Sequence, residues 1–193
     1  MPLVRPISLA EDRPTLDRVV VLGTSGSGKT TFARDLASRL GSPHVEFDAY
    51  RHGPNWTETP NDIFRQRLDE ALSGDRWVAD GNYSVARDIV WPRATAVIWL
   101  DYKFPVVFWR LWWRTIGRAA RRTELWNGNR ESLWGHFLTK DSLFLWVFKT
   151  HWSRGRRYLS AFDLPEYSHL RVLRFHSPRT TNRWLDTLSI TSD

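Results

Sequence analysis

Apolar and polar positions follow two patterns that alternate along the chain. Short apolar runs predict β-strands at residues 18–23, 44–48, 76–80, 95–101 and 170–175. Between them, apolar residues recur every three or four positions, which predicts helices at 29–40, 61–73, 104–122, 131–150 and 178–189. Strands that alternate with helices are typical of a three-layer α/β fold, in which helices flank a parallel sheet. We therefore expect a parallel five-stranded sheet.

The 193 residues suffice for one ordinary domain. Residues 1–15 contain three prolines and several charges, which indicates a loosely attached arm before a domain at 16–193. The chain has no cysteine, which excludes disulfides and thiolate zinc ligands, and its six histidines show no metal-ligand spacing. Arg or Lys soon interrupts every apolar run, and no signal-peptide core opens the chain, so we expect a cytoplasmic protein without a membrane span.

The stretch from Gly23 to Thr30, GTSGSGKT, matches G-x-x-x-x-G-K-[ST] between a predicted strand and a predicted helix. Glycines let backbone N–H groups point at phosphate oxygens, and the following helix N-terminus favours anions. In this motif Lys29 reaches the β- and γ-phosphates and Thr30 binds Mg²⁺. The alternative is a glycine-rich turn that binds nothing. The predicted cofactors are ATP and Mg²⁺, and the candidate nucleotide-binding residues are Gly23, Ser25, Gly26, Ser27, Gly28, Lys29, Thr30 and Thr31.

The net charge of +7 is concentrated in one segment. Residues 105–160 hold eleven Lys and Arg against three acidic residues, an excess of +8, together with seven of the twelve tryptophans. Such a segment indicates a trap for a phosphate-bearing ligand, a nucleic-acid face or an oligomer contact.

The stretch RWVADGNYSVARD, at 76–88, resembles the strand-Asp-Gly-x-x-Arg stretch of adenylate kinases and related nucleoside monophosphate kinases. The resemblance implies that Asp80 lies beside the magnesium ion and that Arg87 meets the acceptor. For Asp80 the alternative is a helix cap or turn residue.

Residues 96–122 resemble the strand and arginine-bearing helix that lead into the lid of these kinases. Arg110, Arg114 and Arg118 recur every four residues and share one helix face, which Arg121 and Arg122 continue. We expect a basic helical lid at 104–160, in which Arg110 binds nucleotide while Arg114 and Arg118 act on the transferring phosphoryl group. The alternative is a solvated basic face.

The predicted strand at 44–48 ends in Asp48, at the edge of the sheet where α/β folds collect ligands. An acceptor-binding insertion is expected at 49–75, where His52 and Trp56 offer a polar and aromatic lining. For Asp48 the alternatives are that it orients or deprotonates an acceptor hydroxyl, that it supports Mg²⁺, or that it only caps a helix. For Trp56 the alternatives are that it lines the site or that it belongs to the core. The last strand and helix, LRVLRFHSPRTTNRWLDTL, resemble the adenine-contacting end of these kinases, which implies that Arg179 lies near the base.

The stretches HGPNW, DGNY and LWNGNRESL are similar to those of a bacterial family described as DNA topology modulation proteins or adenylate-kinase-related kinases. The resemblance implies an ATP-dependent phosphotransferase, monomeric or homodimeric, that acts on a nucleotide or another small acceptor. The sequence lacks the lid motifs of true adenylate kinases, which argues against AMP as acceptor. Two other functions stay open: a nucleotide-dependent DNA- or RNA-associated protein, and a self-associating protein whose tryptophans pack between subunits.

Overall fold

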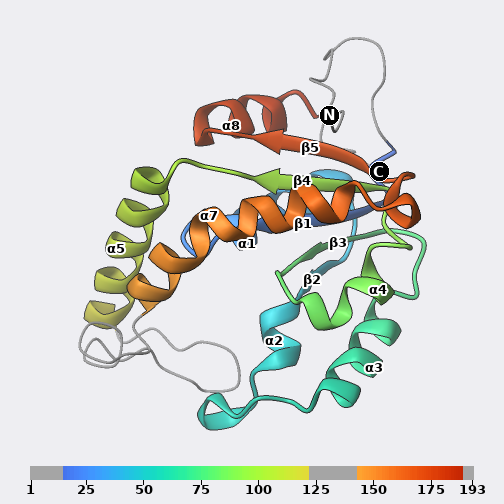
Figure 1. The fold of residues 1–193 in the computed structure, drawn as a ribbon, viewed down its shortest axis with the longest axis horizontal. Coiled ribbons are helices and arrows are strands. Elements are labelled where there is room, and N and C mark those ends of the chain that lie inside the picture. The colour runs from blue at the N-terminus through green and yellow to red at the C-terminus, as the bar shows by residue number, and fades with distance from the viewer. Residues whose placement is uncertain (1–14, 122–142, 189–193) are drawn as a thin grey trace.

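The fold is built on one parallel five-stranded sheet (Figure 1). The computed structural model describes residues 15–121 and 143–188. The strands are β1 (Arg18–Gly23), β2 (His44–Glu46), β3 (Trp77–Asp80), β4 (Ala96–Leu100) and β5 (Arg171–Phe175), in the spatial order β2-β3-β1-β4-β5. This sheet confirms the α/β class that the sequence predicts. The predicted arm at 1–15 lies, apart from its last residue, outside the described residues.

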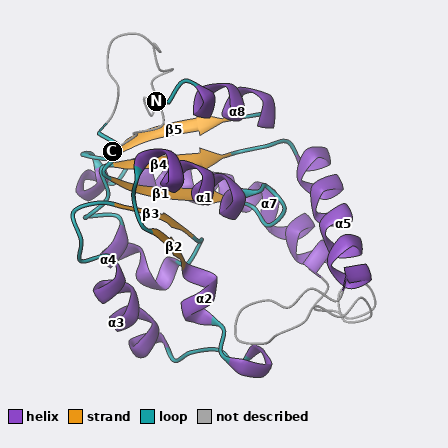
Figure 2. Cartoon of the chain, turned by 180° about the vertical axis from the view of Figure 1, so that it is seen from behind, coloured by secondary structure: helices purple, strands orange, loops and turns teal. Residues whose placement is uncertain are grey.

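Helices cover both faces of the sheet, as Figures 1 and 2 show from opposite sides. They are α1 (Lys29–Leu40), α2 (Phe47–Arg51), α3 (Asn61–Ala71), α4 (Arg87–Val90), α5 (Phe104–Arg121), α7 (Leu143–Phe162) and α8 (Pro178–Asp186). Short 3₁₀ turns lie at Pro54–Trp56, Ser84–Ala86 and Pro165–Tyr167. None of the helices in the described ranges is long and apolar enough to cross a membrane.

Two hydrophobic cores lie on opposite faces of the sheet. Side chains alternate along a strand, so Val20 and Leu22 of β1 pack toward α3, α4 and α7, whereas Val19 and Val21 pack toward α1, α8 and the start of α5. All four residues are almost completely buried. The continuous apolar run of β1 therefore reflects a central strand that is covered on both sides.

Several predicted element boundaries are shifted, and two of these shifts bear on the site. Strand β2 ends at Glu46, which is paired with the last residue of β3, Asp80, so the ladder has no further partner and α2 begins at Phe47. Helix α7 continues to Phe162, well beyond the predicted end at 150, because its last turns bury Tyr158 against the sheet. The predicted residues 131–142 of that helix lie outside the described part.

Candidate nucleotide and acceptor site

The glycine-rich loop between β1 and α1 is closely packed against α5. Gly26 and Gly28 both have left-handed backbone angles, with φ of 88° and 87°. A Cβ on Gly26 would lie 2.7 Å from the carbonyl oxygen of Val107, and a Cβ on Gly28 would lie 3.2 Å from an Arg110 nitrogen. Side chains at these positions would be strained or would clash, whereas glycine leaves the loop's backbone free to face a ligand. This cradle fits a bound phosphate.

The other loop residues differ in exposure and in their contacts. Lys29 is the first residue of α1 and is half-buried, and its ammonium group makes no ion pair among the described residues. Ser27 is fully buried and its amide donates to the carbonyl of Thr24 at 2.9 Å. Ser25 is half-buried and Thr31 is exposed. The first N–H groups of α1 have no partner within the helix, so they are available to an anion at this loop.

Asp80 lies beside the loop and is only 1% exposed. The hydroxyl of Thr30 donates to Oδ2 of Asp80 at 2.7 Å, and Nε2 of His44 lies 2.9 Å from Oδ1. The two residues proposed from the sequence as magnesium neighbours are therefore in direct contact. Asp80 is the last residue of the buried strand β3 and directly precedes Gly81. His44 is a partner that sequence reasoning missed.

Thr30 and Asp80 suit a magnesium ion that is shared with a nucleotide. Both side chains offer the hard oxygen atoms that Mg²⁺ prefers. In the described part of the chain no cluster of three or more His, Cys, Asp or Glu side chains forms a complete metal cage. Magnesium in phosphotransferases usually takes one or two protein ligands and completes its shell with water and phosphate oxygens, so the residues present fit.

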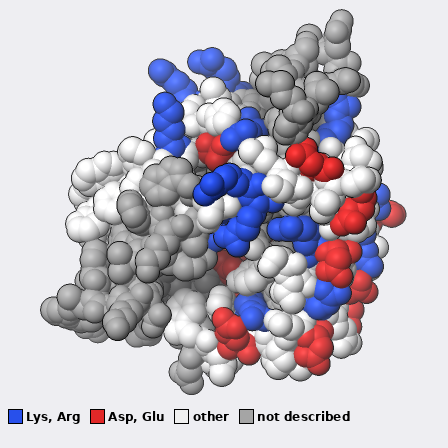
Figure 3. Space-filling view, in the orientation of Figure 1, with Lys and Arg blue, Asp and Glu red and all other residues white. Residues whose placement is uncertain are grey.

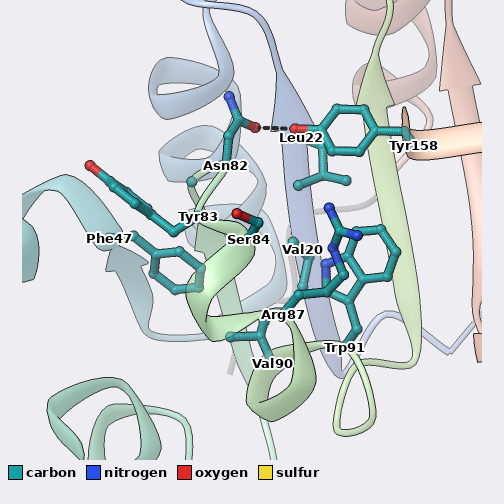
Figure 4. A pocket seen from close by; sticks show the side chains of 11 residues that line it. Val20, Leu22, Phe47, Asn82, Tyr83, Ser84, Arg87, Val90, Trp91 and Tyr158 are labelled. Carbon is teal, nitrogen blue, oxygen red and sulfur yellow. Dashed lines mark hydrogen bonds between the residues drawn. The ribbon is translucent and has the colours of Figure 1, made fainter. Parts of the chain in front are cut away.

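Asn82 connects the start of the loop to α7. Its Oδ1 accepts from the Gly23 amide at 3.3 Å, and its Nδ2 donates to the Gly23 carbonyl. The same Oδ1 accepts from the hydroxyl of Tyr158 at 2.9 Å, as Figure 4 shows. Sequence reasoning assigned no role to Asn82, although it lies in the DGNY stretch that carries the family resemblance.

A small pocket opens beside Asn82 (Figure 4). It is lined by Val20, Leu22, Phe47, Gly81, Asn82, Tyr83, Ser84, Arg87, Val90, Trp91 and Tyr158. The guanidinium of Arg87 lies 4.7 Å from the ring centre of Trp91. Burial raises the pKa of the Tyr158 phenol to about 12, although Arg154 and Arg87 act in the opposite direction. The pocket thus joins a neutral phenol, an amide and one cationic side chain.

Asp48 lies on α2 rather than at the end of a strand, and it is held by Tyr83. The Tyr83 hydroxyl donates to Oδ1 of Asp48 at 2.6 Å and lies 3.4 Å from Nε2 of His52. The ring of His52 meets that of Trp56 edge-on, with centroids 5.6 Å apart. Trp56 is 40% exposed, so it does not belong to the core. The structure therefore brings together three of the four proposed acceptor residues and adds Tyr83.

Arg87, the fourth proposed acceptor residue, lies beside Trp91 and not with the other three. In Figure 4 the Tyr83 hydroxyl points away from Arg87. Burial, followed by the nearby Asp48 carboxylate, raises the pKa of the Tyr83 phenol far above its usual value. Tyr83 therefore stays protonated at neutral pH and acts as a hydrogen-bond donor to Asp48.

Arg51, the last residue of α2, is held by polar groups of the insertion. Arg51 donates to Glu58 at 2.6 Å, and to the Thr59 carbonyl and the Asn61 side chain, both at 2.8 Å. Arg65, further along, forms a two-pronged pair with Asp88. Arg51 thus links residues of the insertion to one another, whereas Arg65 links the insertion to α4.

Helix α5 places its first arginine against the loop. Arg110 donates to the carbonyl of Ser27 at 2.9 Å. Arg114 follows one turn later and is half-buried, whereas the side chains of Arg118 and Arg121, and all of Arg122, lie outside the described residues. Arg179 is exposed in the first turn of α8, which starts at the sheet edge that carries the loop. Seen from the same side as in Figure 1, the protein has Lys and Arg side chains gathered near the middle of its surface (Figure 3).

No protein-family model and no curated protein matches this sequence. Among solved structures, a shikimate kinase from Bacteroides thetaiotaomicron is similar, with 16% identity and a TM-score of 0.52 over 89% of this chain and 96% of that one. A gluconokinase from Sinorhizobium meliloti 1021 is 20% identical, with a TM-score of 0.51 over 92% of this chain and 95% of that one. Membership of the DNA topology modulation family stays a prediction. The sheet order, the glycine loop and these similarities show that the chain has the fold of P-loop small-molecule kinases.

Proposed function

We propose that this protein is an ATP-dependent phosphotransferase that transfers the γ-phosphoryl group of ATP to a hydroxyl group of a small acceptor. The observation that carries the proposal is the 2.7 Å contact between Thr30 and buried Asp80 beside the glycine cradle. The Asp48–Tyr83 pair lies at the same carboxyl edge of the parallel sheet, because α2 directly follows β2. Ligands of open α/β sheets bind at this edge.

The donor half of the site consists of the loop and its neighbours. Backbone amides of the loop and of the start of α1 bind the phosphates, and Lys29 reaches the β- and γ-phosphates. Thr30 and Asp80 hold the magnesium side of the nucleotide. Magnesium–ATP supplies the phosphoryl group and lowers the charge that opposes its transfer.

The acceptor half of the site is the group around Asp48. Its carboxylate orients the acceptor hydroxyl and takes up the proton as the new O–P bond forms and ADP departs. Tyr83 fixes that carboxylate by the 2.6 Å hydrogen bond, while His52 and Trp56 form an adjoining polar and aromatic wall. A nucleoside-like or sugar-like molecule with free hydroxyl groups suits this chemistry. Arg87 binds an anionic group of the acceptor.

The arginines of α5 form the third part of the site. Arg110 already touches the loop through the Ser27 carbonyl, so a guanidinium lies next to the proposed phosphate position. Arg114 follows one turn later, and the four-residue spacing in the sequence predicts that Arg118 continues the same helix face. Guanidinium groups bind phosphate oxygens in pairs and stabilise charge that develops during transfer. We assign Arg110 to the bound nucleotide, and Arg114 and Arg118 to the transferring group.

The decisive test measures ATP consumption by the wild-type protein with panels of nucleosides, nucleotides, sugars, cyclitols and aminoglycoside-type acceptors. We expect one class to accelerate ADP release and to yield a phosphorylated product by mass spectrometry. Lys29→Ala should remove that activity and weaken ATP binding at least tenfold, with an unchanged circular dichroism spectrum.

Unchanged ATP affinity in Lys29→Ala would contradict the donor site. Acceleration by DNA or RNA alone, with no small acceptor active, would contradict the phosphotransferase proposal. That outcome would favour the nucleic-acid function instead.

A further inference from the structure

His44 is the first residue of β2 and reaches along the sheet toward the phosphate loop. In the strand register His44 is paired with Val78, and Glu46 is paired with Asp80. Asp80 is two residues further along β3 than Val78. The His44 side chain therefore extends diagonally between the two strands to bring Nε2 within 2.9 Å of Asp80 Oδ1. The backbone ladder between β2 and β3 does not need this contact, because it is formed by main-chain groups.

The contact with His44 gives the second oxygen of the buried Asp80 carboxylate a polar partner. Asp80 is 1% exposed, and the side chain of His44 is 17% exposed. Oδ2 of Asp80 accepts the Thr30 hydroxyl, and Oδ1 faces His44. Because the Thr30 hydroxyl is the donor to Oδ2, an N–H at Nε2 of His44 can donate to the other oxygen of the same carboxylate. A carboxylate that is held at both oxygens cannot rotate about its Cβ–Cγ bond without breaking a hydrogen bond.

We infer that His44 is a positioning residue, which holds the Asp80 carboxylate in the plane that Thr30 and the magnesium shell of a bound nucleotide require. The inference rests on the proposed function. It is supported by the chain His44–Asp80–Thr30, in which each member is within 2.9 Å of the next. Partners that orient a metal-side carboxylate typically change metal affinity by about 10- to 100-fold when they are removed.

The test compares wild type with His44→Leu and His44→Gln. Leucine removes the donor, whereas the terminal amide of glutamine reaches about as far as Nε2 and can donate to Oδ1. The readout is the binding of a fluorescent, non-hydrolysable ATP analogue, measured without metal and across a Mg²⁺ titration, together with the thermal unfolding midpoint. His169→Leu is the matched control, because His169 lies before β5 at the opposite edge of the sheet and contacts the Trp91 carbonyl.

In His44→Leu we expect the Mg²⁺ midpoint for analogue binding to rise by about 10-fold or more, with metal-free binding unchanged. His44→Gln should recover most of the wild-type midpoint, and His169→Leu should not change it.

A folded His44→Leu protein with the wild-type Mg²⁺ midpoint would overturn the inference and leave the proposed function intact. Equal loss of analogue binding with and without Mg²⁺ would also overturn it, because a merely structural role predicts that result. If the wild-type protein bound the analogue with no dependence on Mg²⁺, the donor site of the proposed function would fail as well.

Discussion

The hydroxyl of Tyr158 donates to Oδ1 of Asn82 at 2.9 Å, across 76 positions of sequence. Asn82 also bonds both the amide and the carbonyl of Gly23, where the phosphate loop begins. Helix α7 is thereby connected to the loop through one amide side chain. A change in the position of α7 would weaken the Tyr158–Asn82 bond and so loosen the support of the loop, because a hydrogen bond weakens steeply when its geometry is lost.

Tyr158→Phe tests that connection. The change removes one partly buried hydrogen bond and keeps the ring, so we expect a loss of about 1 kcal/mol in the free energy of unfolding. If the bond also positions the loop, ATP affinity should fall severalfold. Urea unfolding and nucleotide titration measure the two effects. Tyr167→Phe is the control, since Tyr167 is buried against Trp91, away from the loop. Lower stability with unchanged ATP affinity would limit the Tyr158 bond to a structural role.

Gly26→Ala tests the approach of α5 to the loop. The new Cβ would combine a left-handed backbone with a 2.7 Å contact to the Val107 carbonyl, so we expect a loss of about 2–4 kcal/mol. Gly41→Ala is the control, because Gly41 has a φ of 58° and open space around its Cβ position. It should lose only about 1–2 kcal/mol. Equal losses in urea unfolding would mean that α5 yields easily at this contact.

Asp48→Asn should lower turnover with the identified acceptor by about 100-fold or more, because the amide cannot take up the acceptor proton. ATP affinity should not change, since Asp48 belongs to the acceptor half of the site. Tyr83→Phe removes the supporting 2.6 Å bond, together with the longer 3.4 Å contact to His52, and should cost about tenfold. Steady-state kinetics and ATP titration of both variants measure these effects. Wild-type turnover in Asp48→Asn would remove Asp48 from the chemistry.

Alkaline pH should destabilise the protein. Burial raises the pKa of Tyr158 from 10.0 to about 12, and the pKa of Tyr83 is also raised. Above about pH 10 the unfolded chain therefore loses phenolic protons that the folded chain keeps, so the free energy of unfolding falls as pH rises. Urea unfolding between pH 8 and about 11.5 measures the slope. Tyr158→Phe should flatten it, and an identical slope in that variant would contradict the assignment of the shift to Tyr158.

Local patterns in the sequence determined much of the framework. The five strands and the helix after the glycine loop were predictable, because apolar runs and helical periodicity reflect burial against one or two faces. The loop itself was predictable as well, since its glycines adopt left-handed backbone angles that other residues rarely adopt, and their spacing is visible in the sequence. The placement of Thr30 next to Asp80 could be expected only through resemblance to kinases, because the two residues are 50 positions apart.

Only the tertiary structure decided which side chains support that framework. His44 meets Asp80 because β2 lies next to β3, and Asn82 meets Tyr158 because α7 packs across the sheet. The position of Asp48 on α2 follows from the end of the strand ladder at Glu46, which no local pattern marks. Such contacts depend on strand order and helix packing. These arise from the burial of the whole chain, so residues distant in sequence acquire partners that their own neighbours in sequence do not indicate.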